Sequence, residues 1–590
     1  MRHDPPQLYD LAVDPGERFD VAAAHPDEAA RLVKLARAHE ASFQPPPSQL
    51  VATTDDPATP AAVKPGQGAA IQRRLPPVAP ALDELVAKLD EPARAAWQGV
   101  PDRLAALGKR LAALPPGDPQ AWAEVEVLLK GVHYARDCGE WWEPAHLARA
   151  TWALDEAEAR MSALADGKTP WRTQTGPVAL GFRSKLDGSV QPYGIVVPER
   201  LDPARPAPVW IWLHGRGERD TDLHFLWQKS RKSGEFFPAD AIVLMPFGRY
   251  CNGWKGPGTA DVFEALDALA ALRPIDRDRV VLAGFSMGGA GAWGIGARRT
   301  DRFCAIHGGA GFVDTARFMG LAATDVPPWE ARLWLLSDVP PVVRNLLNLP
   351  AIAYSGEVDR QRAASEIMVE SLAAEGRELP HVIGAGMAHK YDEPSKARIA
   401  AFLAPAVAAG RPRSPEQVHW AGTTLADGGA WWVEPLALGE HCAPARVDAV
   451  RDRSAPRADL DVTTANITAL RLREVDGPCR IEIDGTVLDG RGDADGVVLV
   501  REGLRPDGAW AIGSAAALPA KRKRPGLTGP IDDAFNSPFV VVGPTGPGFH
   551  PAVDGFVAAE LAHFTARWHD LFRGELPVVA AADVTPELLA

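Results

Sequence analysis

The chain has 590 residues, with a hydrophobic fraction of 46% and a charged fraction of 24%, which are ordinary values for globular proteins. At about 150 residues per domain, this length predicts roughly four domains. The formal net charge of −13 is spread along the chain and argues against a nucleic-acid-binding protein, which would carry a basic domain or stripe. No apolar run reaches the roughly 18 residues that a membrane-spanning helix needs, and the opening MRHDPPQLYD lacks the layout of a signal peptide. We therefore expect a soluble multidomain protein, whose localisation and oligomeric state the sequence leaves open.

The N-terminal part reads as an extension followed by a linker. Within residues 8–43, a DPGE turn precedes apolar residues at helical spacing. The stretch LYDLAVDPGE with its following helix resembles the C-terminal tail of sulfatases and carries no catalytic part. We interpret residues 1–48 as this sulfatase-tail-like extension, with a plain exposed helix as the alternative. Residues 49–80 are rich in Pro, Ala and Thr and predict a linker.

The rest of the chain changes its periodicity three times. Residues 81–168 have a helical period with breaks at Pro101, Pro115 and Pro144, which predicts a helical region of three or four helices. Residues 169–408 alternate short apolar runs with helical stretches, which predicts an α/β domain with a mostly parallel sheet and helices on both faces. Residues 409–515 contain short strand-like runs bounded by Gly, Asp and Pro, typical of a small β-sandwich-like domain. Residues 516–590 form a short α/β segment, which we expect to be truncated.

The most specific motif lies at a predicted strand-to-helix junction. Residues 284–288 read GFSMG and fit G-x-S-x-G, directly after the apolar run RVVLAGF and directly before the small-residue stretch MGGAGAWGIGARR. In this context the serine occupies a tight, strained turn that exposes its hydroxyl at the carboxyl edge of the sheet. The pattern predicts Ser286 as a nucleophile.

A serine hydroxyl needs a base, and the base needs an orienting carboxylate. Asp359 follows the apolar run AIAYSG, and His389 lies in a Gly-rich loop after another strand-like run, so the order Ser, acid, His is kept. Their rivals are the acids Glu357 and Asp338 and the histidines His381 and His307, which we expect to be structural or solvated residues.

Two backbone N–H groups must stabilise the oxyanion. We expect one from Met287, the residue after the nucleophile. We expect the other from Arg216, because HGRG at residues 214–217 fits H-G-x-G after the strand-like run VWIWLH; a plain strand-end turn is the competing interpretation. Candidates for the substrate pocket, with packing against the core as the alternative, are His214, Trp254, Trp293 and Phe312.

These residues make the chain resemble the α/β-hydrolase superfamily, in its esterase and prolyl-oligopeptidase-like branch of planctomycete type. The resemblance covers residues 85–590 and is most specific between 209 and 392. It implies an α/β-hydrolase fold and hydrolysis of an ester or a peptide without a metal or organic cofactor. The family pattern is expected to continue beyond residue 590.

We therefore expect a serine carboxylesterase that acts through an acyl-enzyme on a small-molecule or polymeric ester. Feruloyl or acetyl esters, simple short-chain esters and polyesters all stay open. A prolyl-oligopeptidase-like peptidase is the alternative, but it would normally carry repeated propeller blades, and none occurs here. A binding protein on an inactive scaffold is disfavoured because all three triad positions are filled. The CAPAR run at 442–446 matches the start of a sulfatase motif by coincidence, because the following Thr-Gly is missing.

Overall fold

The computed structural model describes residues 7–9, 20–42, 79–586 and 588, apart from 115–116, 218, 220, 323, 325, 453–456 and 549. The predicted linker at 49–80 lies outside these residues except for residues 79 and 80. The chain divides into two compact units, Met1–Pro65 and Gly66–Ala590. No helix in the described part of the chain is long and apolar enough to cross a membrane.

The first unit contains one described helix, α1 (Pro26–Ser42). Asp27 and Glu28 occupy its first turn, where negative charge interacts favourably with the helix dipole. The helix lies where the apolar spacing predicts one, and the likeness of this region to a sulfatase tail stays a prediction.

The helical region at the start of the second unit has five helices where the sequence predicts three or four. The additional boundary arises at Asp90, whose side chain accepts a hydrogen bond from Ala93 N at 2.9 Å and so caps a new helix. The break predicted at Pro101 lies at Gly99, and Pro101 occupies the first turn of the next helix, where its missing N–H costs nothing. The helices are α2 (Leu82–Ala87), α3 (Glu91–Gln98), α4 (Val100–Ala112), α5 (Pro119–Asp137) and α6 (Pro144–Ala165).

The central sheet has eight strands in the order β1-β2-β4-β3-β5-β6-β7-β8. β1 is antiparallel to β2 and β2 to β4, whereas β4, β3, β5, β6, β7 and β8 are mutually parallel. This topology confirms the predicted α/β-hydrolase fold. The strands are β1 (Gly176–Arg183), β2 (Val190–Val197), β3 (Ala207–Leu213), β4 (Ile242–Pro246), β5 (Ile275–Phe285), β6 (Ala305–Gly309), β7 (Ala351–Gly356) and β8 (His381–Gly384).

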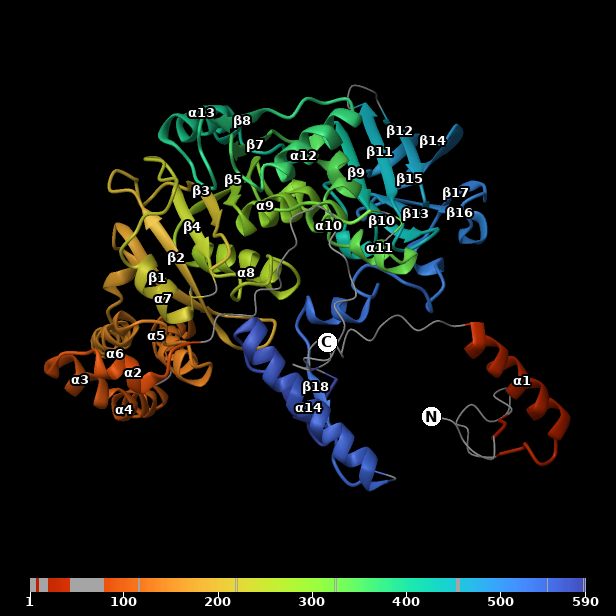
Figure 1. Ribbon diagram of the computed structural model, residues 1–590. Coiled ribbons are helices and arrows are strands. Elements are labelled where there is room, and N and C mark those ends of the chain that lie inside the picture. Colours follow the sequence, from red (N-terminus) through yellow and green to blue (C-terminus); the bar gives the residue numbers. More distant parts are fainter. Residues whose placement is uncertain are drawn as a thin grey trace. The chain divides into compact units, whose positions relative to one another are not determined.

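Helices cover both faces of this sheet (Figure 1). Because side chains alternate along a strand, Leu282 of β5 joins the hydrophobic cluster formed with α8, α9 and α12, whereas Val281 joins the cluster formed with α13. α5 and α7 pack over β1 and β2. These helices are α7 (Asp222–Lys229), α8 (Pro257–Leu272), α9 (Met287–Arg298), α12 (Ala363–Ala374) and α13 (Glu393–Ala409), with the short α10 (Thr315–Met319) and α11 (Pro328–Trp334) between β6 and β7.

A β-rich domain follows the hydrolase domain and packs two sheets face to face around one apolar core. The four-stranded sheet has the order β10-β13-β16-β17 and the five-stranded sheet the order β15-β14-β12-β11-β9. Asn345, only 4% exposed, links the domain to the hydrolase: its Nδ2 donates to Ala297 O at 2.8 Å and to Ala421 O at 2.7 Å. The strands are β9 (Gln417–Gly422), β10 (Val433–Leu438), β11 (Ala445–Asp452), β12 (Ala458–Ala465), β13 (Ile467–Leu472), β14 (Gly477–Ile483), β15 (Thr486–Gly492), β16 (Val497–Arg501) and β17 (Trp510–Gly513).

The C-terminal segment contains β18 (Val541–Gly543), α14 (Pro551–Phe572) and β19 (Val578–Ala580), with β18 parallel to β19. The end of α14 is bound to the hydrolase domain. Buried Trp568 donates from Nε1 to Asp187 Oδ2 at 2.8 Å, and Gln191 Nε2 donates to Arg573 O at 2.7 Å. The turn between β1 and β2 therefore has the C-terminal segment as its direct neighbour.

Candidate active site

Ser286 lies at the junction between β5 and α9, in a backbone conformation that non-glycine residues rarely adopt. Its φ is 60° and its ψ is −122°, and its N–H donates to Gly309 O at 2.9 Å. A residue held in such a region costs about 1–3 kcal/mol and persists only where the surroundings fix it. The predicted strand-turn-helix context is present, and the Ser286 side chain is half-buried at the carboxyl end of β5.

The two glycines of the motif permit the close approach that fixes this turn. A Cβ at Gly284 would lie 2.2 Å from Gly288 O, and a Cβ at Gly288 would lie 1.9 Å from Leu213 O. Both distances are far below van der Waals contact, so only glycine fits at either position. The first turn of α9 can therefore lie directly against the ends of β5 and β3.

Asp359 and His389 form a hydrogen-bonded pair beside this turn. His389 Nδ1 lies 2.8 Å from Asp359 Oδ2, and the Asp359 side chain is 1% exposed. The His389 ring packs on Phe285, the residue before Ser286, with ring centroids 4.6 Å apart. Among the described residues, no hydrogen bond joins the Ser286 hydroxyl to His389; such contacts often tighten only in substrate complexes. The structure thus brings the three predicted residues to one edge of the sheet and links two of them directly.

The competing histidines have structural partners. His307 is fully buried, with Nδ1 3.1 Å from Ile352 O and Nε2 2.8 Å from Tyr391 Oη. Burial lowers the pKa of His307 to about 4. His381 Nε2 lies 2.8 Å from Ser355 Oγ on the neighbouring strand.

The competing acids are also engaged elsewhere. Glu357 Oε2 accepts a hydrogen bond from Gly386 N at 2.7 Å. Asp338 Oδ1 accepts hydrogen bonds from the backbone and the hydroxyl of Thr315, at 3.1 and 2.6 Å. Neither carboxylate therefore competes with Asp359 for the ring of His389.

The loop after β3 lies next to the nucleophile candidate. A Cβ at Gly215 would be 3.4 Å from Ser286 Cβ, so this loop passes directly over the serine side chain. Arg216 follows on the exposed side of the loop, and Met287 is the buried first residue of α9, whose N–H has no acceptor within the helix. Met287 thus follows Ser286 directly, and Arg216 follows the glycine that lies against the serine side chain; their role as oxyanion donors stays a prediction.

Of the four pocket candidates, the two tryptophans are core residues. Trp293 is 0% exposed, and Trp254 is 2% exposed with its Nε1 donating to His214 O at 3.2 Å. Trp254 therefore supports the loop after β3 from beneath. The rings of His214 and Phe312 are half-buried; His214 Nε2 lies 2.8 Å from Phe247 O, and Phe312 packs on Phe318.

A buried charge cluster under the loop after β4 was not predicted. The fully buried Arg249 donates to Asp187 Oδ2 and Oδ1 at 2.8 and 3.0 Å and lies 3.8 Å from Asp261. Asp261 Oδ2 accepts a hydrogen bond from Gly248 N at 2.8 Å, and burial raises the pKa of Asp261 to about 7. Breaking a buried ion pair typically costs about 3–5 kcal/mol, so Arg249 fixes the loop that carries Trp254.

Among the described residues, one group of potential metal ligands lies close together, formed by Cys138, His569 and Asp570. Arg573 Nη1 lies 3.0 Å from Cys138 Sγ, and burial raises the pKa of the Cys138 thiol to about 12. A cation would thus meet a protonated thiol beside a guanidinium, so this group does not fit a metal site.

Residues 249–403 match the Prolyl oligopeptidase family. A search of curated protein sequences found no relative of the chain. Among solved structures, a putative dipeptidyl aminopeptidase IV from Bacteroides ovatus is 12% identical with a TM-score of 0.30, over 41% of this chain and 37% of that one. S-formylglutathione hydrolase from Staphylococcus aureus is 17% identical with a TM-score of 0.30, over 40% and 100% of the two chains, and a ferulic acid esterase is 19% identical with a TM-score of 0.29, over 40% and 97%.

The family match and the sheet topology together support a serine hydrolase of the α/β-hydrolase superfamily. The matched segment contains Ser286, Asp359 and His389. The match covers about a quarter of the chain, so the helical region, the β-rich domain and the C-terminal segment lie outside it.

Proposed function

We propose that the chain is a serine carboxylesterase in which Ser286, His389 and Asp359 form the catalytic triad. The observation that carries the proposal is the 2.8 Å contact between Asp359 Oδ2 and His389 Nδ1, beside a serine held at a positive φ at the end of β5. A half-buried serine in a strained turn, next to a carboxylate-oriented imidazole, is the arrangement that activates a hydroxyl for acyl transfer.

The residues would act in the following order. His389 takes the proton from the Ser286 hydroxyl, whose oxygen attacks the ester carbonyl, and the N–H groups of Met287 and Arg216 stabilise the resulting oxyanion. The alcohol leaves with the proton from His389, and an acyl-serine is left. Water, deprotonated by His389, then attacks the acyl carbon and releases the acid. Asp359 fixes the tautomer of His389 and stabilises the imidazolium.

The region before the sheet favours an ester over a peptide substrate. Residues 81–165 form helices joined by short loops where described, and none of the described residues before β1 forms a strand, so propeller blades do not precede the hydrolase domain in this part of the chain. The name of the matching family supports the second candidate, a prolyl-oligopeptidase-like peptidase. Feruloyl, acetyl and polyester substrates are the esters to examine first.

The test is hydrolysis of p-nitrophenyl esters from acetate to palmitate, together with a peptide p-nitroanilide. Wild type is compared with Ser286→Ala and with Ser162→Ala, an exposed serine on α6. We expect ester turnover that Ser286→Ala reduces by about 10⁶-fold and Ser162→Ala leaves unchanged. Turnover of the anilide alone would favour the peptidase, and ester turnover that survives in Ser286→Ala would refute the assigned site.

A further inference from the structure

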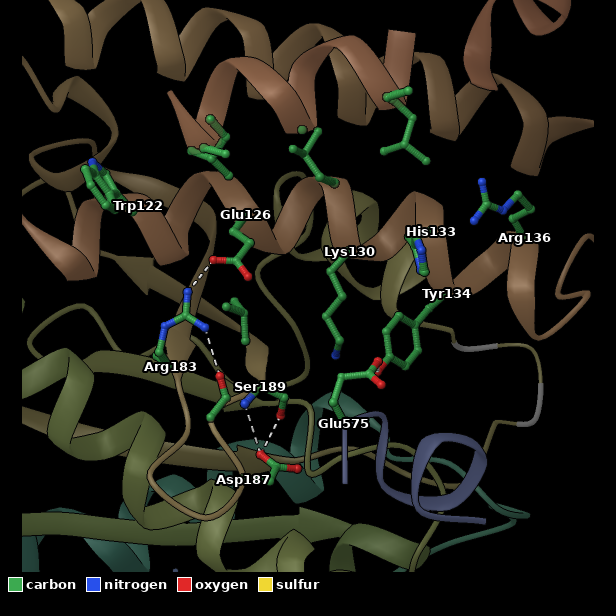
Figure 2. A pocket seen from close by; sticks show the side chains of 18 of the residues that line it. Trp122, Glu126, Lys130, His133, Tyr134, Arg136, Arg183, Asp187, Ser189 and Glu575 are labelled. Carbon is green, nitrogen blue, oxygen red and sulfur yellow. Dashed lines mark hydrogen bonds and ion pairs between the residues drawn. The ribbon is translucent and has the colours of Figure 1, made fainter. Parts of the chain in front are cut away.

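A groove of about 820 Å³ lies between the helical region and the turn that joins β1 to β2. Figure 2 shows it below and beside α5, with Glu126, Lys130 and Tyr134 on one side and Asp187, Ser189 and Glu575 on the other. None of the predicted site residues lines it. Its volume is in the range of small-molecule sites, which is about 300–1,000 Å³.

One wall of the groove is apolar and has an open notch. The wall is formed by Leu104, Ala105, Leu111 and Ala112 of α4 together with Leu129 of α5. Gly108 lies in the middle of α4, and no atom lies within 4 Å of the position that its Cβ would occupy. Alanine would fit there and would favour the helix, whereas a larger side chain would narrow the groove.

The opposite end of the groove brings a donor and an acceptor close to the ring of Tyr134. The ammonium of Lys130 lies 4.6 Å from the centroid of Tyr134, and the Tyr134 hydroxyl donates to Glu575 Oε1 at 2.8 Å. Lys130 uses two of its three N–H groups, on Asp222 at 2.7 Å and on Gln191 at 3.4 Å. A further N–H of Lys130 and the second oxygen of Glu575 therefore suit a ligand at this end.

The polar groups around the groove select against an ionic ligand. Glu126 pairs with Arg183, Asp187 pairs with Arg249, and Lys130 pairs with Asp222. Glu575 makes no ion pair with any described residue, and it shares the end of the groove with Lys130. An anion would meet the carboxylate of Glu575, and an ammonium group, which has no acceptor, would face an N–H group of Lys130. A hydroxyl group can accept from Lys130 and donate to Glu575.

We propose that this groove is a second binding site, distinct from Ser286, for an uncharged hydroxylated amphiphile such as an alkyl or aryl glycoside. The apolar body lies along α4 at Gly108, and the hydroxyl groups lie between Lys130 and Glu575. Binding at this site does not depend on the esterase reaction, so the failure of either proposal leaves the other intact.

The test uses three ligands with the same six-carbon chain and different heads: n-hexyl β-D-glucoside, hexylamine and hexanoate. Isothermal titration of the full chain, carrying Ser286→Ala to exclude turnover, measures each affinity. We expect the glucoside to bind once per chain and at least tenfold more tightly than either ion. Equal affinity for the three heads, or no glucoside binding at millimolar concentration, would overturn the proposal.

Two variants then locate the site. Gly108→Leu fills the notch and should weaken glucoside binding at least tenfold, whereas Gly108→Ala, which only adds a Cβ in open space, should have a much smaller effect. Glu575→Gln removes the negative charge and should improve hexanoate binding several-fold, whereas Glu560→Gln, at an exposed position of α14, should not. Unchanged glucoside binding in Gly108→Leu would place the ligand elsewhere and refute the site.

Discussion

Gly574 offers a sharp test of how the C-terminal segment is held on the hydrolase domain. A Cβ at this position would lie 2.1 Å from Asp187 Oδ2, 3.0 Å from Ser189 Oγ and 3.1 Å from Arg249 Nη1. Asp187 cannot move aside freely, because two hydrogen bonds from Arg249 and one from Trp568 hold its carboxylate. The φ of Gly574 is not in the left-handed region, so replacement by alanine tests steric contact and not backbone conformation.

The expected size of the effect follows from these contacts. Inserting one methyl group into a well-packed region costs about 1–3 kcal/mol. At about 1.4 kcal/mol per tenfold, this corresponds to roughly 5- to 150-fold in the equilibrium between the docked and the open segment. In Gly574→Ala, amide hydrogen exchange should therefore accelerate by this factor at the end of α14 and in the turn at residues 184–189.

Gly555→Ala is the control: Gly555 lies inside α14, which ends just before Gly574, and no atom lies within 4 Å of its Cβ position. Alanine in a helix interior is favoured over glycine by about 1 kcal/mol, so exchange in this variant should slow or stay unchanged. Hydrogen exchange read by mass spectrometry measures both segments in one experiment. Equal exchange in Gly574→Ala and wild type would show that the reasoning from the Asp187 contacts is wrong.

Further predictions concern the triad, the buried acid and the link between domains. Asp359→Asn should lower kcat by about 10⁴-fold with little change in KM, measured by ester kinetics; a change below tenfold would refute its role. Because burial raises the pKa of Asp261 from 3.8 to about 7, the folded state binds an extra proton in this range, and stability should fall as the pH rises from about 4 to about 7. Urea unfolding across that range should show a smaller fall in Asp261→Asn, and equal slopes would contradict the assignment. Asn345→Ala leaves buried backbone groups of Ala297 and Ala421 unpaired, so limited proteolysis between the hydrolase and β-rich domains should become several-fold faster; an unchanged rate would count against this link.

Apolar patterning predicted the hydrolase domain well, because its strands are buried on both faces and appear as continuous apolar runs. Each of the eight strands of the central sheet contains such a run, although β5 begins earlier, at the charged stretch IDRDR, and the order of the strands in space is set by tertiary packing. The strands of the β-rich domain were harder to predict from the sequence. β11 (Ala445–Asp452) alternates buried and exposed residues and carries four charged side chains, so no apolar run marks it. The eight-residue α7 is similarly too short for a helical period to stand out.

The triad candidates could be found because each follows a strand and because a short motif surrounds the serine. The buried residues that support the site could not be found from the sequence. Arg249 and Asp187 are 62 positions apart, and both are charged residues that a sequence pattern assigns to a solvated loop. Gly and Asn residues surround Trp254 just before α8, and this composition predicts a turn. It does not predict that Trp254 is buried or that it contacts His214.

The contact between Trp568 and Asp187 also has a consequence for the order in which the protein matures. These residues are 381 positions apart. At about 5–20 residues per second, a ribosome needs roughly 20 to 75 s to add the second partner after the first. During this interval the sheet of the nascent hydrolase domain can form, but Arg249 and Asp187 are not yet covered by the end of α14. The docking of α14 on the turn between β1 and β2 therefore comes after the synthesis of the whole central sheet.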